Sequence, residues 1–237
     1  MLVQSIKSKG GEQKLRDENV KGVYICLEGL KGAGKTTIFN NLVTKLREKE
    51  VDFSTVSPTR SSGNVHLIER LMKKFPSLKS KRLPRIFLYA HRSNYAAAHA
   101  NWNKPLILGE RSIATSFATK WSHSSIRTQF NFGIINLLEN KIRTPDYVIY
   151  IDVPHDILRE RIDSRDKERD MDDSVSRLKE MEEAYLQMMN HCQIKRMSNV
   201  KWIQVSGVGS PESICGNILE LITQLSNLEK NKEPLIS

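Results

Sequence analysis

The sequence predicts an α/β fold in which helices cover both faces of a five-stranded parallel sheet, a three-layer α/β/α arrangement. Short apolar runs of strand length alternate along the chain with stretches of helical periodicity, as in folds built from strands and crossover helices. The first apolar run leads directly into a glycine-rich loop and then into a helix. A chain of 237 residues is long enough to form one such domain with a large core.

The glycine-rich loop is the most informative stretch of the chain. Residues 23–28 have the composition of a buried parallel strand, and residues 29–36 then read G-x-x-x-x-G-K-T. A helical pattern with Ile38, Leu42 and Leu46 on one face follows at once. Strand, loop and helix in this order are typical of the phosphate-binding P-loop, in which backbone N–H groups and a helix N-terminus surround an anion.

The P-loop predicts how ATP and its metal ion are held. Lys35 would bridge the β- and γ-phosphates of ATP, and Thr36 would ligate Mg²⁺. We therefore expect an ATP site formed by Gly29, Leu30, Lys31, Gly32, Ala33, Gly34, Lys35, Thr36 and Thr37.

The other elements follow in alternating order. Further strands are expected at residues 52–57, 105–109, 147–153 and 201–205. Helices are expected at residues 65–72, 86–102, about 126–141 and 155–162, after Ser112, through Tyr185, and from Pro211 onward. We expect residues 1–21 to form a flexible polar arm, residues 22–228 the folded domain, and residues 229–237 a frayed tail.

Composition narrows the class of protein. No apolar run reaches the about 18 residues that span a membrane, and the N-terminus resembles neither a signal peptide nor a transit peptide. The cysteines Cys26, Cys192 and Cys215 are far apart, and no histidine spacing suggests a metal site. We therefore expect reduced thiols, a cytoplasmic location and no membrane partner.

The chain is strongly basic, with a net charge of +10. Such a charge favours an anionic partner, which is either a nucleotide or a nucleic acid. The most basic segment, residues 73–85, contains Pro76 and Pro84. We interpret it as a broken, solvated face, so a nucleic-acid partner is possible but not favoured.

Charged residues follow several strands at the edge where open α/β sheets bind ligands. Glu110 ends the third strand and is suited to hold Mg²⁺ through water or to orient an acceptor oxygen. The alternative for this carboxylate is a helix cap or an ion pair. Arg60, Arg92 and Arg111 would form a basic cup for an acceptor phosphate, because a guanidinium offers paired donors to phosphate oxygens.

Three further arginines, Arg161, Arg165 and Arg169, are spaced by four residues within a predicted lid at about residues 159–171. A helical segment would place all three on one face, where they would close over the transferring phosphoryl group. The alternative is a solvated helix face whose arginines pair with neighbouring carboxylates.

These motifs resemble those of the thymidylate kinase family across about residues 22–225. The resemblance lies in E-G-L-K-G-A-G-K-T-T, in Thr59-Arg60, in L-Y-A-H-R ending at Arg92, in Glu110-Arg111-Ser112, and in the strand P-D-Y-V-I-Y-I-D-V-P. It implies a P-loop kinase that moves the γ-phosphate of Mg-ATP to dTMP and acts as a homodimer. The lid arginines and Gly32 resemble the bacterial type, in which the lid supplies the catalytic arginine.

The resemblance also implies roles for individual residues. The catalytic set is Lys35, Glu110, Arg111, Arg161, Arg165 and Arg169. The substrate-binding set is Arg60, Phe87, Leu88, Arg92, Arg111 and Thr115. Thr36 and Glu110 are the residues implied for Mg²⁺.

The sequence departs from the family on the acceptor side. Lys31 stands where the family usually has an acidic residue that contacts the acceptor sugar, and Leu88 stands where a phenylalanine usually stacks on thymine. The usual Tyr-Gln-Gly segment after Ser112 is not recognisable, and Ser61-Ser62-Gly63 replaces the usual loop after Arg60. A deoxynucleoside kinase, whose E-R-S motif is similar, therefore stays open. So does a nucleic-acid-associated ATP-binding protein or polynucleotide kinase.

Overall fold

The computed structural model describes residues 22–60, 67–75, 77–78, 82–122, 125–164, 174–190 and 194–230. The predicted arm at residues 1–21 lies outside these ranges, as do residues 231–237 of the predicted tail. Arg165, Arg169 and Cys192 also lie outside them.

Five parallel strands form one sheet, which confirms the predicted fold class. Their order across the sheet is β2-β3-β1-β4-β5. The strands are β1 (Val23–Glu28), β2 (Phe53–Val56), β3 (Leu106–Glu110), β4 (Tyr147–Asp152) and β5 (Lys201–Ser206). Because β1 is the central strand, the P-loop that follows it lies in the middle of the sheet's carboxyl edge.

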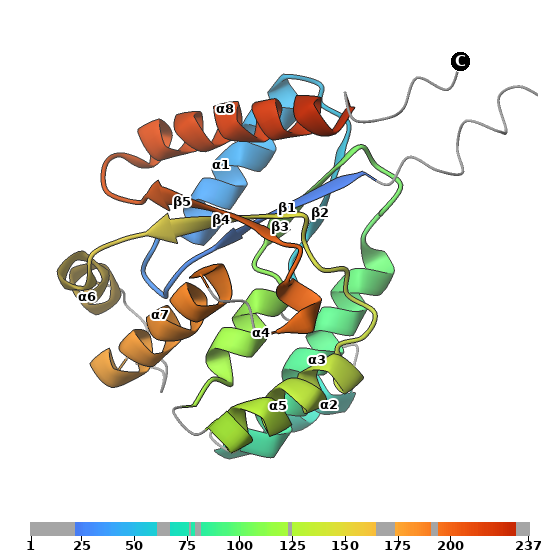
Figure 1. The fold of residues 1–237 in the computed structure, drawn as a ribbon, viewed down its shortest axis with the longest axis vertical. Helices are drawn as coiled ribbons and strands as arrows, with labels where there is room; N and C mark the ends of the chain where they lie inside the picture. Colours follow the sequence, from blue (N-terminus) through green and yellow to red (C-terminus); the bar gives the residue numbers. More distant parts are fainter. Residues whose placement is uncertain are drawn as a thin grey trace, which may run out of the picture.

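Helices cover both faces of the sheet (Figure 1). One face carries α1 (Lys35–Glu48) and α8 (Pro211–Lys230), and α6 (His155–Asp163) lies beyond the end of β4. The other face carries α2 (Leu67–Lys74), α3 (Arg82–His99), α4 (Ile113–Thr119), α5 (Ser125–Leu138) and α7 (Val175–Asn190), with a short 3-10 helix at Lys195–Met197. Among the described residues, no helix is both long enough and apolar enough to cross a membrane.

The core is built from the apolar runs that predicted the strands. Every residue of β1 and β3 is buried, as expected for parallel strands covered on both faces. Ile38, Leu42 and Leu46 of α1 are buried as their spacing predicts. Within the described part of the chain, Cys26 and Cys215 are buried free thiols.

The predicted start of α3 was wrong. The helix begins at Arg82 rather than at Ile86, so the last residues of the basic segment 73–85 are helical. Pro84 lies in the first helical turn, where a missing N–H removes no intrahelical bond. A proline close to the start of a helix is therefore no reason to end the helix there.

We predict that Gly109→Ala destabilises the fold. A Cβ atom at Gly109 would lie 2.8 Å from the Cβ of Cys26 and 2.8 Å from Cε2 of Tyr24 on the neighbouring strand. Overpacking of this kind lowers the free energy of unfolding by about 1–3 kcal/mol. Urea unfolding followed by circular dichroism measures this change.

Gly216→Ala is the matched control, because a Cβ atom at this position in α8 meets nothing within 4 Å. Alanine is favoured over glycine in helices, so the free energy of unfolding of this variant is expected to rise by about 0.5–1 kcal/mol. Equal stability changes in the two variants would contradict the close packing between β1 and β3.

Candidate functional site

The P-loop encloses the side chain of Lys35. Gly32 has a φ of 96°, which favours glycine, and a Cβ atom there would lie 3.0 Å from the carbonyl oxygen of Leu158 in α6. The Lys35 ammonium donates to the carbonyl oxygens of Gly29 at 2.9 Å and Leu30 at 2.6 Å. The sequence therefore positions a buried cation inside the loop, at the N-terminus of α1.

Thr36 and Glu110 meet beside this loop. The Thr36 hydroxyl donates to Oε1 of Glu110 at 2.5 Å, and Nε of Arg60 donates to Oε2 at 2.8 Å. A hydroxyl and a carboxylate at this position are the oxygen ligands that Mg²⁺ prefers in phosphate sites. The two residues therefore fit the metal role that the sequence assigned to them.

A cavity of about 210 Å³ adjoins the P-loop. Its walls come from the P-loop, the turn after β2, the turn between β3 and α4, and the helices α3, α4 and α7. The lining residues are Lys31, Thr59, Tyr89, Arg111, Thr115, Ser116, Thr119 and Met181. Among these described lining residues are two cations, four hydroxyl groups from Ser and Thr, and no carboxylate. The cavity is therefore suited to a polar, anionic molecule with an aromatic part.

Arg111 is the arginine that lines this cavity. Its φ of 69° lies in the left-handed region, which is uncommon for a residue with a side chain. Its backbone N–H donates to the carbonyl oxygen of Leu27 at 3.0 Å. Within the described residues, the Arg111 side chain makes no ion pair with a carboxylate.

The other two predicted arginines each pair with a carboxylate. Arg60 forms its ion pair with Glu110, at 2.7 Å. Arg92 donates to both carboxylate oxygens of Glu69 at 2.6 and 3.0 Å, and to the carbonyl oxygen of Thr59 at 3.2 Å. Glu69 was not predicted as a site residue, although its place three residues before buried Met72 puts it on the inner face of α2.

Tyr89 is the α3 aromatic residue that lines the cavity. Phe87 is 52% exposed and Leu88 is buried, and neither is a lining residue. The guanidinium carbons of Arg85 and Arg92 lie 6.0 and 5.8 Å from the Tyr89 ring centre. Arg85, Tyr89 and Arg92 are spaced by four and three positions, which places them on one helix face. Tyr89 was not predicted as a site residue, although this spacing could have identified it.

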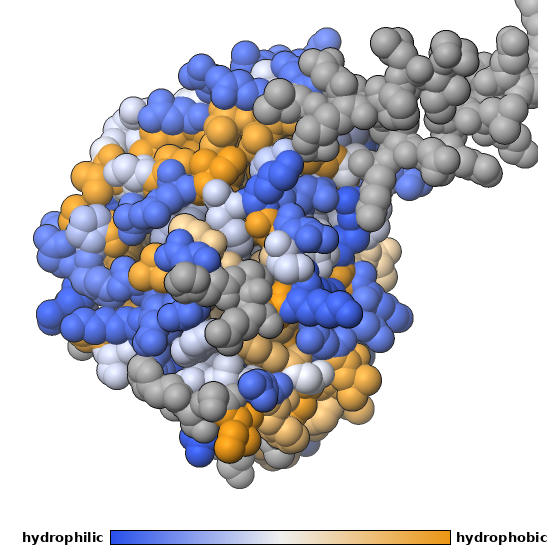
Figure 2. Space-filling model, viewed as in Figure 1, coloured by the Kyte–Doolittle hydropathy of each residue, from blue (hydrophilic) through white to orange (hydrophobic). Residues whose placement is uncertain are grey.

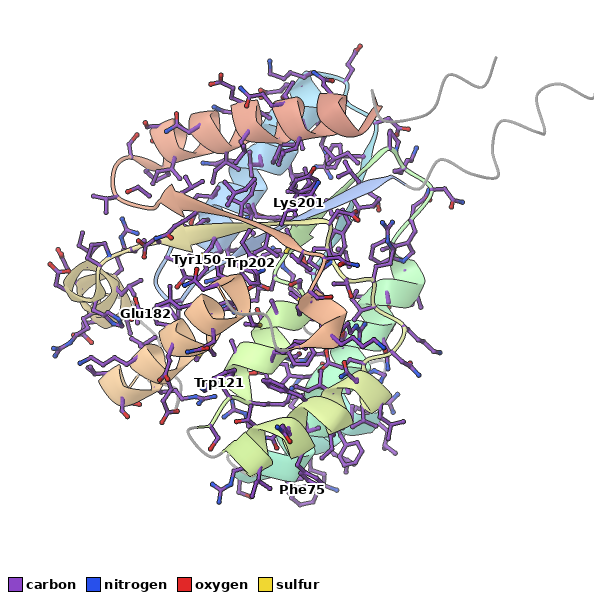
Figure 3. The ribbon with its side chains drawn as sticks, viewed as in Figure 1. Phe75, Trp121, Tyr150, Glu182, Lys201 and Trp202 are labelled. Atoms are coloured by element: carbon purple, nitrogen blue, oxygen red, sulfur yellow. The ribbon has the colours of Figure 1, made fainter. Side chains whose placement is uncertain are left out.

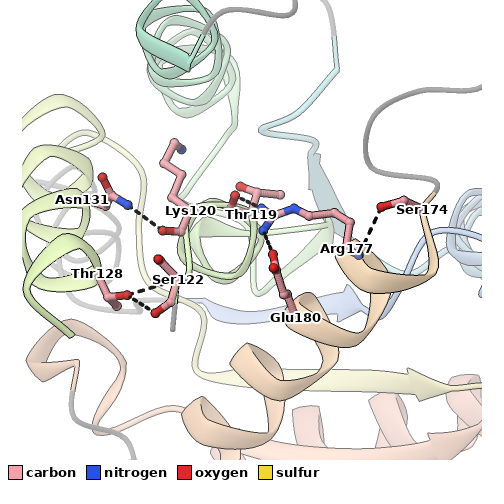
Figure 4. Close-up of polar contacts among 8 residues, drawn as sticks. All are labelled: Thr119, Lys120, Ser122, Thr128, Asn131, Ser174, Arg177 and Glu180. Carbon is pink, nitrogen blue, oxygen red and sulfur yellow. Dashed lines mark hydrogen bonds and ion pairs between the residues drawn. The ribbon is translucent and has the colours of Figure 1, made fainter. Parts of the chain in front are cut away.

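The end of α4 forms the wall next to Tyr89 and is held from two sides (Figure 4). Asn131 of α5 donates to the carbonyl oxygen of Lys120 at 2.7 Å, and Arg177 of α7 donates to that of Thr119. The Lys120 ammonium lies 3.5 Å from Glu139 and 5.8 Å from the Tyr89 ring centre. Burial lowers the pKa of Lys120, and the Glu139 carboxylate opposes this effect.

Arg161 lies away from the cavity walls. Its Nη2 donates to the carbonyl oxygen of Gly207 at 3.2 Å, in the loop between β5 and α8. Helix α6 ends at Asp163, and Arg165 and Arg169 fall outside the described residues. Of the three predicted lid arginines, only Arg161 is therefore placed.

The sequence is similar to known thymidylate kinases. A family model for thymidylate kinase matches residues 27–204, which is most of the chain. The thymidylate kinase of Oenococcus oeni is 26% identical over 220 residues, covering 86% of this chain and 96% of that protein. The enzyme of Fervidobacterium nodosum is 24% identical over 207 residues, covering 84% and 98%. That of Haemophilus ducreyi is 29% identical over 153 residues, covering 59% and 67%.

Proposed function

We propose a function from one premise: the chain belongs to the thymidylate kinase family. In the proposed reaction, the γ-phosphoryl group of ATP moves to dTMP, which gives dTDP and ADP. The supporting observation is that Lys31 of the P-loop and Arg111 line one cavity, so the ATP site and an acceptor cavity share a wall. The family and the named relatives favour this reaction over a deoxynucleoside kinase or a nucleic-acid-associated protein.

On the ATP side, Lys35 neutralises charge on the β- and γ-phosphates. Its ammonium lies within the P-loop, where it would exchange its bonds to the carbonyl oxygens of Gly29 and Leu30 for bonds to phosphate oxygens. Thr36 and Glu110 would hold Mg²⁺, directly or through water. The metal ion supplies charge neutralisation for phosphates whose charge increases as the phosphoryl group leaves.

On the acceptor side, we assign the dTMP phosphate to Arg111, assisted by Arg60. Arg60 lies beside this region because Glu110 holds its guanidinium. We assign contact with the base to Tyr89 instead of Phe87 or Leu88, because Tyr89 lines the cavity. Thr115 of α4 also lines the cavity, although its hydroxyl donates to the buried Glu28 carboxylate at 2.7 Å.

An acceptor screen tests the function directly. All common nucleosides and nucleoside monophosphates are offered with Mg-ATP, and ADP release is measured; dTMP is expected to give the highest kcat/KM. Lys35→Ala should lower kcat by at least about 10²-fold, because a cation next to the developing charge is lost. Lys49→Ala, at the exposed end of α1, is the control. A different preferred acceptor would overturn the proposal.

Arg161→Ala distinguishes two roles for this arginine. The lid hypothesis predicts a loss of kcat. The bond of Arg161 to Gly207 and the packing of α6 against Gly32 indicate instead that Arg161 supports ATP binding. We expect the KM for ATP to rise by about tenfold while kcat changes by less than about twofold. Steady-state kinetics with the exposed neighbour Arg159→Ala as control measures this. A selective loss of kcat would restore the lid role.

Lys31→Asp tests whether Lys31 contributes to acceptor choice. The ammonium can only donate hydrogen bonds, whereas a carboxylate accepts them from a sugar hydroxyl. Because Lys31 lines the cavity, the ratio of kcat/KM for dTMP to that for 3′-substituted analogues should change by at least about threefold. An unchanged ratio would show that Lys31 does not set specificity.

We also propose a homodimer that uses the outer faces of α2, α3 and α5. Ile126, Phe130 and Leu137 of α5 are 81%, 68% and 72% exposed and share one helix face. Phe87 of α3 and Phe75 after α2 are also exposed, and Figure 3 shows Phe75 at the lower edge of the molecule. Figure 2 shows apolar surface at the lower right, where Figure 1 places these helices. Such a patch indicates a protein contact.

Phe130→Glu should convert the dimer to a monomer, because a buried carboxylate without a partner disfavours association. Light scattering after gel filtration measures the mass. Leu186→Glu, which introduces the same charge at an exposed leucine of α7, is the control. A monomeric parent protein, or a dimeric Phe130→Glu variant, would contradict the proposal.

The cytoplasmic location stays a prediction from the sequence.

A further inference from the structure

Glu28 is a fully buried carboxylate to which the proposed reaction assigns no part. It is the last residue of β1, directly before the P-loop, and its exposed fraction is 0%. Oε1 accepts hydrogen bonds from the backbone N–H and the hydroxyl of Ser112, at 2.7 and 2.8 Å. Oε2 accepts from the hydroxyls of Thr115 at 2.7 Å and Tyr185 at 2.9 Å. A buried carboxylate needs such donors, because an unpaired one is strongly unfavourable.

The donors come from two distant parts of the chain. Ser112 and Thr115 belong to the start of α4, and Tyr185 belongs to α7. Burial, reinforced by the Glu28 carboxylate, raises the pKa of Tyr185 well above its usual value, so its hydroxyl keeps the proton that it donates. Figure 3 labels Tyr150 and Trp202, two aromatic neighbours of Tyr185, between the sheet and α7. Glu28 thus joins the P-loop, α4 and α7.

The same contacts fix the backbone around Arg111. The N–H of Arg111 bonds to Leu27, and the next N–H, that of Ser112, bonds to Glu28. The last two residues of β1 therefore hold both peptide units that flank the Arg111 side chain. A left-handed conformation is unfavourable for a residue with a side chain, so it persists only where neighbouring contacts enforce it.

We propose that Glu28 is a positioning residue that holds Arg111 and Thr115 in the acceptor cavity. Arg111 and Thr115 both line that cavity, and in the sequence they flank Ser112, which bonds to Glu28. The bond to Tyr185 extends this control to α7, the first described helix after the predicted lid. The proposal rests on the proposed function only in taking the cavity as the acceptor site.

Glu28→Gln tests the proposal with minimal change of shape. The amide keeps an oxygen for Ser112 and places an NH₂ group toward hydroxyls that can also accept. We expect the affinity for the acceptor, measured by calorimetry without ATP, to fall about tenfold, and the KM for ATP to change by less than about twofold. A variant that merely loosened the P-loop would weaken ATP binding equally, and this result would overturn the proposal.

A double-mutant cycle shows whether Glu28 acts through Arg111. In an Arg111→Ala background, Glu28→Gln should weaken acceptor binding by clearly less than in the parent protein, because only Thr115 is then left for Glu28 to position. Full additivity of the two losses would overturn the proposal. If Glu28→Gln does not fold, Ser112→Ala replaces it in the affinity measurement and in the double-mutant cycle. This substitution removes one hydroxyl donor to Glu28.

Tyr185→Phe and Tyr150→Phe form a matched pair. Both remove a hydroxyl from the same aromatic cluster, whose rings lie 5.2 Å apart, but only Tyr185 bonds to Glu28. Acceptor affinity should fall several-fold in Tyr185→Phe and stay unchanged in Tyr150→Phe; equal effects would overturn the link to α7.

All binding experiments use the acceptor that the wild-type protein phosphorylates best. A preferred acceptor other than dTMP would therefore overturn the proposed function while still testing Glu28.

Discussion

The parallel pairing of β1 with β3 is the constraint on which the candidate site depends. Its register places Leu27 opposite Glu110, so the two strands end at the same level of the sheet. The P-loop leaves β1 there, and the Glu110-Arg111-Ser112 turn leaves β3 beside it. A slip of one residue would turn Glu110 to the other face of the sheet and separate its carboxylate from Thr36. Backbone pairing in the core therefore sets the distance between the P-loop and the cavity that Arg111 lines.

Carboxylates organise the positive charge around this edge. Glu110 holds Arg60 and Glu69 holds Arg92, so ion pairs orient two of the three arginines that were predicted to bind an acceptor phosphate. Arg111 is oriented through its backbone instead, and its guanidinium is left to line the cavity. An arginine already neutralised by a carboxylate attracts an anion less than one without such a partner. The attraction of the site for an anion therefore depends more on which arginines are paired with carboxylates than on the net charge of +10.

Sequence reasoning predicted most of the fold because its signals are local. Apolar runs gave the strands of the sheet, and the spacing of Ile38, Leu42 and Leu46 gave the buried face of α1. The site was harder to predict. The local spacing of Glu69 and Tyr89 indicates the helix face on which each lies, but it does not indicate what that face, or the face that carries Met181, packs against. The choice between Phe87, Leu88 and Tyr89 depends on how α3 is rotated about its own axis. That rotation is set by tertiary contacts.

The burial of Glu28 illustrates the same limit from the energetic side. Glu28 is an acidic residue at the end of an otherwise apolar strand, and burial of its charge is unfavourable until four donors surround it. Those donors lie 84 to 157 residues away along the chain, so the carboxylate is satisfied only when α4 and α7 are both in place. An apolar residue would fill the position without needing any of these partners. A carboxylate at this position makes the placement of the P-loop, of the Arg111 turn and of α7 depend on one another. A site that aligns two nucleotides requires such mutual placement.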